Sequence, residues 1–250
     1  MKYLGFFLTL ISVLLISGCQ SEDIFSLPVK PKPFLIGLPA DLSNQQTSSI
    51  HNCAKAMPDG SIQTTIYTKT YPDPTDFNLL IWQGNPAFYP ALNTDVINFI
   101  VVGIEEIVVI VSPDNYLTSL SLTDLQSIFA GKIQDWSGIP LSDLSGPIEL
   151  WVLYNTHPLR LIFDDVLFGN LTISTSALIM PSQAEANSLI EENANIISYV
   201  GKSQASPNAR ILPVSGVPET PSLSLLVIFQ DNEESRISPV LDCLLNNNSH

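Results

Sequence analysis

Residues 122–136 read LTDLQSIFAGKIQDW, and this stretch carries the clearest helix signal of the chain. Ser121 stands at the N-cap position with an aspartate three residues later, which is a spacing typical of a capping box. The apolar residues between positions 122 and 129 share one face of a helix. Gly131 follows, as glycine commonly does after the last helical residue. The stretch therefore predicts a short amphipathic helix that ends at Gly131.

Apolar and β-branched segments lie on both sides of this helix and alternate with further helical patterns. Strands are expected at residues 34–38, 62–68, 77–82, 98–102, 107–111, 148–153, 196–200, 211–214 and 223–229. Further helices are expected at residues 42–57, 158–168, 182–193 and 235–245. Asp41 could cap the first of them. The alternation of strands and helices predicts an α/β fold rather than a β-sandwich or a helix bundle.

The stretch at 122–136 resembles a segment of the periplasmic phosphate-binding-protein family, the substrate-binding proteins of phosphate ABC transporters. Three neighbouring segments are also similar to the family: VVIVSPDN at 108–115, IISYVG at 196–201 and LPVSG at 212–216. The resemblance covers most of residues 98–230. It implies a binding protein, not an enzyme.

The resemblance further implies the two-lobed fold of type II periplasmic binding proteins, an α/β fold with the ligand cleft between the lobes. Residues 33–250 would form this solute-binding domain. Lobe one would hold about 33–105 and 230–250, and lobe two about 106–222. The strands near 106–111 and 223–229 would cross between the lobes.

The N-terminus has the order of a secretory signal. In residues 1–18, Lys2 precedes an apolar run that ends in small residues. Cys19 follows, and the run from Leu15 to Cys19 resembles the lipobox of bacterial lipoproteins, in which the cysteine is lipidated. The alternative is an ordinary signal with a cysteine near its cleavage site. We expect a membrane-anchored, extracytoplasmic lipoprotein with a polar tether at residues 19–32.

The other cysteines and the charge limit the partners. If Cys19 carries lipid, Cys53 and Cys243 remain, and an exported compartment permits a disulfide between them. Two buried free thiols are the alternative. The cysteines and histidines show no metal-ligand spacing, so neither a metal nor another cofactor is expected. The net charge of −14 argues against nucleic acid, and we expect a monomer.

The resemblance also locates candidate ligand-binding residues. The family motif S-G-T-R-x-x-F opens a helix whose backbone N–H groups favour an anion. Here Arg160 and Phe163 match, but the residues in place of Ser, Gly and Thr are His157, Pro158 and Leu159. Asn155 and Thr156 could partly compensate. His157 could instead be a surface residue at the helix start, and Arg160 could pair with Asp164.

Two other phosphate-contact motifs of the family are altered. After the first strand stand Ala40 and Asp41, and this carboxylate would repel an anion. After the third strand, the segment from Trp82 to Asn85 replaces the family's Ser-Asp acceptor. The candidate ligand-binding residues are therefore Ala40, Asp41, Trp82, Asn155, Thr156, His157 and Arg160.

Three functions compete at this point. The first is a solute-binding lipoprotein that delivers phosphate, another small anion or an uncharged solute to an ABC permease. The second is an envelope sensor or interaction module that has lost transport. The third, an exported hydrolase, is disfavoured because the sequence lacks both G-x-S-x-G and H-E-x-x-H.

Overall fold

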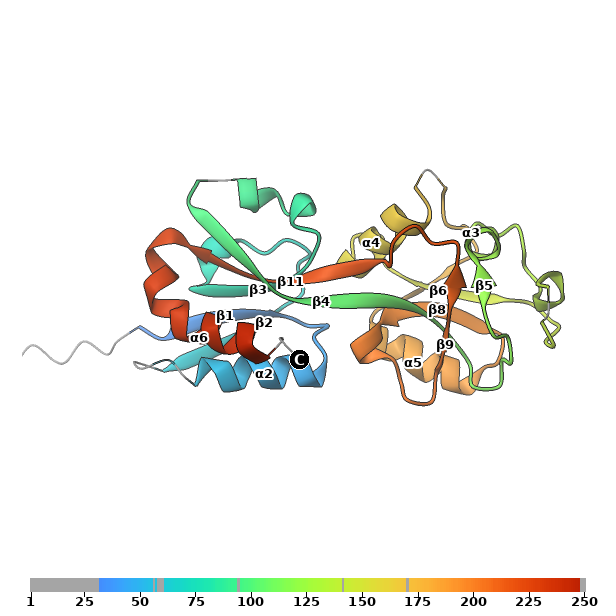
Figure 1. Ribbon diagram of the computed structural model, residues 1–250, viewed down its shortest axis with the longest axis horizontal. Helices are drawn as coiled ribbons and strands as arrows, with labels where there is room; N and C mark the ends of the chain where they lie inside the picture. The colour runs from blue at the N-terminus through green and yellow to red at the C-terminus, as the bar shows by residue number, and fades with distance from the viewer. Residues whose placement is uncertain are drawn as a thin grey trace, which may run out of the picture. The chain divides into compact units, whose positions relative to one another are not determined.

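The computed structural model describes residues 32–247 except positions 56, 58–60, 94, 141 and 170 (Figure 1). The predicted signal peptide, Cys19 and all but the last residue of the tether lie outside the described residues. Residues 33–250 form a compact unit of their own. Within the described part of the chain, no helix is both long enough and apolar enough to cross a bilayer.

We call lobe one the part of the domain that contains two buried apolar clusters. The residues of these clusters come from 34–102 and from 225–244. The sheet of lobe one has the order β2-β1-β3-β11-β4. The strands are β1 (Phe34–Pro39), β2 (Ile62–Tyr67), β3 (Leu79–Gly84), β4 (Ile97–Val111) and β11 (Ser222–Gln230). β1 is parallel to β2 and β3, whereas β11 runs antiparallel to β3 and β4.

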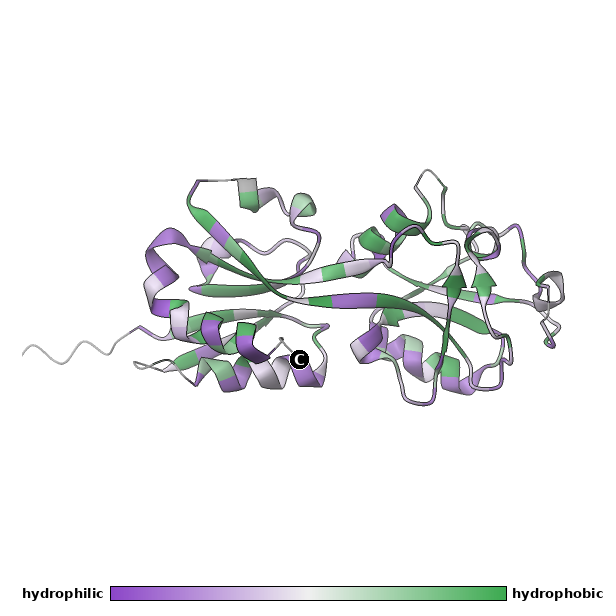
Figure 2. Cartoon of the chain, viewed as in Figure 1, coloured by the Kyte–Doolittle hydropathy of each residue, from purple (hydrophilic) through white to green (hydrophobic). Residues whose placement is uncertain are grey.

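Two helices cover one face of this sheet, α2 (Asn44–Ala54) and α6 (Glu234–Asn247). The helices show both apolar and polar positions while the strands beneath them are largely apolar, as expected for a buried sheet (Figure 2). A disulfide joins Cys53 of α2 to Cys243 of α6, with 5.4 Å between their Cα atoms. The two cysteines are therefore not free thiols.

Lobe two is built on one buried cluster with residues from 107 to 223. Its strands are the end of β4, β6 (Glu149–Leu153), β7 (Leu178–Met180), β8 (Ile196–Gly201) and β9 (Arg210–Leu212), with the small pair β5 (Leu120–Ser121) and β10 (Val214–Ser215) beside them. Its helices are α3 (Leu122–Phe129), α4 (Pro158–Leu167) and α5 (Gln183–Glu192). Short 3-10 helices of the two lobes lie at Pro74–Asp76, Pro86–Phe88, Pro90–Asn93, Trp136–Gly138, Lys202–Gln204 and Asp231–Glu233.

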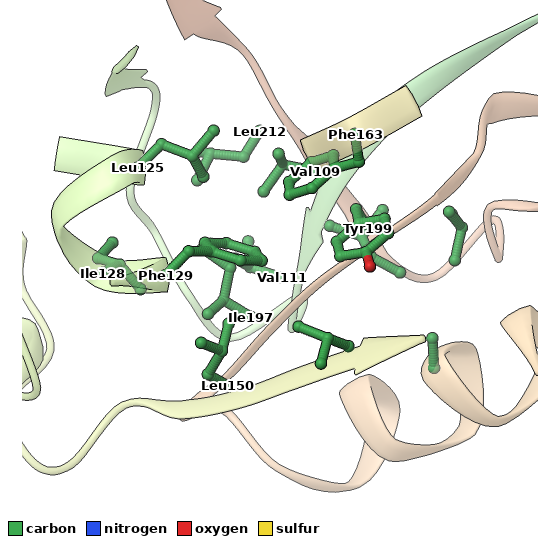
Figure 3. Close-up of a cluster of buried hydrophobic side chains, with 14 of the residues drawn as sticks. Val109, Val111, Leu125, Ile128, Phe129, Leu150, Phe163, Ile197, Tyr199 and Leu212 are labelled. Carbon is green, nitrogen blue, oxygen red and sulfur yellow. The ribbon is translucent and has the colours of Figure 1, made fainter. Parts of the chain in front are cut away.

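Aromatic packing is the centre of the lobe two core (Figure 3). The rings of Phe163 and Tyr199 stack with their centroids 3.8 Å apart, and Phe129 of α3 lies 5.2 Å from Phe163. All three side chains are fully buried. The predicted helix at 122–129 therefore positions a residue that ties α3, α4 and β8 together.

The prediction of two separate strands at 98–102 and 107–111 was wrong. β4 is a single strand of 15 residues, because β11 pairs with it as far as Glu106 and β8 pairs with it from Ile107 onward. The two glutamates in its middle do not interrupt backbone pairing. β4 and β11 thus belong to both lobes, as Figure 1 shows.

The cap of α3 agrees with the sequence pattern, whereas that of the first helix does not. Ser121 accepts the N–H of Asp124, as predicted, and Ser182 accepts that of Glu185 at the start of α5. Asp41, however, does not cap α2. Ser43 does, through a reciprocal capping box in which Ser43 and Gln46 each bind the other's backbone N–H. A Ser-x-x-Gln pattern outcompetes Asp41 because Ser43 lies next to the first helical residue.

Candidate functional site

A cavity of about 60 Å³ lies between the two lobes. On the side of lobe one, its wall is formed by the carboxyl ends of β1, β2 and β3, which meet at one edge because these strands are parallel. On the side of lobe two, the wall is formed by the start of α4 together with Gln183 and Gln204. Carboxyl ends of parallel strands are where open α/β sheets bind ligands.

Ala40, Asp41, Trp82 and His157, four of the predicted residues, line this cavity. Asn155 and Thr156 do not line it, and both are exposed in the turn before α4. Arg160 does not line it either.

Arg160 is held inside lobe two. Its Nε donates to both carboxylate oxygens of Asp164, at 2.8 and 2.7 Å, and its Nη1 donates to the carbonyl of Leu153 at 2.9 Å. Burial raises the pKa of Asp164, and the hydrogen bond and charge of Arg160 act in the opposite direction. Arg160 therefore supports the junction of α4 and β6, the alternative that its spacing to Asp164 had indicated.

His157 caps α4 and reaches across the cleft. Its Nδ1 accepts the N–H of Leu159 at 3.2 Å, and its Nε2 lies 2.5 Å from Oδ2 of Asp41. A ring nitrogen that accepts an N–H carries no proton, so the proton is on Nε2 and is donated to the carboxylate. His157 is 4% exposed, so it is not a surface residue.

This arrangement leaves fewer free donors at the start of α4. Pro158 has no N–H, and the N–H of Leu159 is bound by the imidazole. The carboxylate of Asp41 lies where the positive end of the helix favours an anion. Gln204 of lobe two also donates a hydrogen bond to the carbonyl of Asp41. Asp41 is therefore held at two points by the opposite lobe.

Glu105 is a cavity residue that the sequence analysis missed. It is 8% exposed, and its carboxylate accepts the N–H of Ser203 at 2.7 Å, the hydroxyl of Ser203 at 2.8 Å and the side-chain amide of Gln46 at 3.2 Å. Gly201 makes room for it, because a Cβ there would lie 3.0 Å from the Glu105 side chain. The sequence did contain a sign of this role, since Glu105 is an acidic residue at a buried position of the largely apolar strand β4.

The charge around the cavity is mixed with an acidic excess. Asp41 and Glu105 contribute carboxylates, and Lys69, which is exposed, contributes the one ammonium or guanidinium group among the described lining residues. Tyr154 also lines the cavity, and burial followed by the charge of Asp41 raises the pKa of its phenol. In the described ranges, no three His, Cys, Asp or Glu side chains are grouped so as to hold a metal ion.

Comparisons with known proteins identify the superfamily and the fold. A family model described as a PBP superfamily domain matches residues 90–242. No curated protein matches the chain by sequence.

Several solved structures share the fold. One is described as a phosphate ABC transporter substrate-binding protein from Clostridium perfringens with bound phosphate; the TM-score is 0.69 and the identity 15%, over 85% of this chain and 93% of that one. An ABC-type phosphate transport receptor from Vibrio cholerae has a TM-score of 0.62 and an identity of 10%, over 86% of this chain and 98% of that one. A reduced form of OxyR from N. meningitidis has a TM-score of 0.59 and an identity of 15%, over 87% of this chain and 96% of that one.

Proposed function

The chain belongs to the PBP superfamily, and we propose that it is an extracytoplasmic, lipid-anchored solute-binding protein that delivers a small solute to an ABC importer. The observation that carries this proposal is the cavity between two lobes that share β4 and β11. Strands that run through both lobes allow the lobes to close on a ligand about a hinge.

Three further features support delivery to an importer. The fold is that of phosphate-binding-protein-like periplasmic binding proteins. Two of the similar structures are described as components of phosphate ABC transport. The lipobox-like run ending at Cys19 would hold the protein at the membrane, where a permease would receive the solute.

The ligand need not be phosphate. The Clostridium perfringens protein was solved with phosphate bound, but in this chain the start of α4 is capped by His157 and faces the carboxylate of Asp41. A free oxyanion would have to displace that carboxylate or bind beside it, which like charges disfavour.

Thermal unfolding of the purified protein with a panel of oxyanions, sugars, amino acids and amines tests solute binding. A ligand at a hundred times its Kd should stabilise the protein by about 2.7 kcal/mol. If no member of a broad panel raises the unfolding temperature, solute binding is contradicted. Uptake of the identified ligand by cells with and without the gene then tests transport.

The anchor is tested separately. Labelled fatty acid should enter the protein in bacterial cells, and Cys19→Ala should abolish the label. Cys53→Ser is the matched control, since Cys53 is engaged in the disulfide, and it should keep the label. Loss of label in the control variant alone would contradict the assignment to Cys19.

An envelope sensor without transport is the second candidate. It is favoured by the similarity to the reduced OxyR structure and to the effector-binding domain of QuiR in complex with shikimate, which has a TM-score of 0.58. Permease and ATPase genes beside this gene would favour transport. A lone gene or a neighbouring signalling gene would favour the sensor.

A further inference from the structure

Gln83 presents an unused amide to the cavity between the lobes. The residue is 8% exposed, lies at the carboxyl end of β3 and lines the cavity. Its side chain makes no hydrogen bond to any described residue. Buried polar groups in native proteins are nearly always paired with protein, water or ligand, so this amide points to a polar occupant of the cavity.

The sheet register places Gln83 and Glu105 on the same face. Gln83 pairs with Leu225 of β11, and Glu105 pairs with Leu223. Residues two apart on a strand point to the same side, and directly paired residues share a side. Gln83 and Glu105 therefore both lie on the face covered by α2, and Leu223 between them also lines the cavity.

The cavity offers hydrogen-bond acceptors at the carboxylates of Asp41 and Glu105. Oδ2 of Asp41 is bound by His157, but no described residue donates to its Oδ1. The carboxylate of Glu105 receives three donors and offers about four acceptor sites. Some of the N–H groups that would hold an oxyanion are used within the protein: those of Ser43 and Gln46 by the capping box of α2, and that of Leu159 by His157.

We propose that this cavity binds a small solute with a protonated amine and discriminates against phosphate and sulfate. The N–H groups of the amine are received by Asp41, Glu105 and the side-chain oxygen of Gln83. Charge-assisted hydrogen bonds of this type are the strong ones. The aromatic rings of Trp82 in lobe one and Tyr154 in lobe two, which both line the cavity, add attraction for a cation. This inference rests on the proposed solute-binding function and names its ligand class.

The first test compares charges at one size. Thermal unfolding and titration calorimetry are run with ethylamine, ethanolamine and glycine, with phosphate and sulfate, and with ethanol and ethylene glycol, the uncharged isosteres of ethylamine and ethanolamine, all at matched ionic strength. At least one amine should bind, and its uncharged isostere should bind at least about tenfold more weakly. Stabilisation by phosphate or sulfate with no response to the amines overturns the amine assignment and leaves solute binding intact. If neither these probes nor the broad panel raises the unfolding temperature, both the amine assignment and the solute-binding function are overturned.

The second test assigns the residues. Glu105→Gln and Gln83→Leu should each weaken binding of the amine by about tenfold or more. Gln83→Leu removes no hydrogen bond of the described chain, so its unfolding temperature without ligand should stay at or above that of the wild type. Glu106→Gln is the matched control, since Glu106 pairs with Lys202 and does not line the cavity; its affinity should be unchanged. Equal affinities for wild type and both cavity variants overturn the proposal.

Discussion

The imidazole of His157 bonds to the carboxylate of Asp41 across 116 residues of sequence, with 2.5 Å between Nε2 and Oδ2. Asp41 follows β1 in lobe one, and His157 caps α4 in lobe two. Together with the bond from Gln204 to the carbonyl of Asp41, this contact joins the walls of the cavity through the protein's own groups. His157 thus has two tasks, capping a helix and linking the lobes.

Replacing His157 should remove both its hydrogen bond to the N–H of Leu159 and its bond to Asp41. His157→Ala leaves the N–H of Leu159 without its cap and Asp41 without its partner. We expect the free energy of unfolding to fall by about 1–2 kcal/mol in urea denaturation. His51→Ala, at an exposed position of α2, should change it by less than about 0.5 kcal/mol. Equal effects of the two substitutions would show that the link across the cavity contributes nothing.

Gly201 has little room for a side chain, for reasons of space rather than backbone conformation. Its φ of −64° suits any residue, but a Cβ would lie 3.0 Å from Cγ and Oε1 of Glu105. Gly201→Ala should displace Glu105 from Ser203 and lower the free energy of unfolding by about 1–3 kcal/mol. The control is Gly138→Ala, whose nearest neighbour is a methyl group of Ile133 at 3.3 Å. A neutral Gly201→Ala, measured in urea, would contradict the close packing of Glu105.

The disulfide should stabilise lobe one strongly, because it closes a loop of 190 residues. The double variant Cys53→Ser/Cys243→Ser should lose about 2–5 kcal/mol of unfolding free energy. Reduced wild-type protein should unfold at nearly the same urea concentration as the double variant, and reductant should not affect the variant further. A wild-type midpoint insensitive to reductant, with both thiols shown free by alkylation, would argue against a stabilising bond.

Alkaline pH should destabilise the fold through its buried tyrosines. Burial raises the pKa of Tyr67, Tyr89 and Tyr199 above the ordinary value of about 10. The folded state therefore holds these protons more tightly than the unfolded state. Their contribution is fully present below about pH 10 and is lost as the pH rises through the folded pKa values.

Tyr199→Phe isolates one of these groups. Its hydroxyl is buried without a hydrogen-bond partner among the described residues, so its removal should leave stability at pH 8 unchanged or raised. The fall in unfolding free energy between pH 9 and 11 should be shallower in the variant. An equally steep fall in both proteins would mean that Tyr199 does not contribute to it.

Some elements could be predicted because neighbouring residues decide them. Ser121 caps α3, and Gly131 follows that helix with a φ of +73°, a conformation that glycine adopts without strain. The pairing of Arg160 with Asp164 belongs to the same class, since residues four apart on a helix face each other. The local pattern could not show that residues 98–102 and 107–111 belong to one strand, β4. The continuity of β4 depends on its pairing with β11 and β8.

The sequence by itself determined the α/β alternation, the helix cap at Ser121 and the resemblance that implied a two-lobed binding fold. Only the tertiary structure decided which side chains face the cavity. Asp41, Glu105 and His157 come from three distant segments, and long-range packing sets which partners they meet. Local patterns reach about one helical turn, whereas the cavity is formed by contacts across the whole domain. Four of the seven candidate residues located by the resemblance line the cavity, but the hydrogen bond between His157 and Asp41 could not be predicted from the sequence.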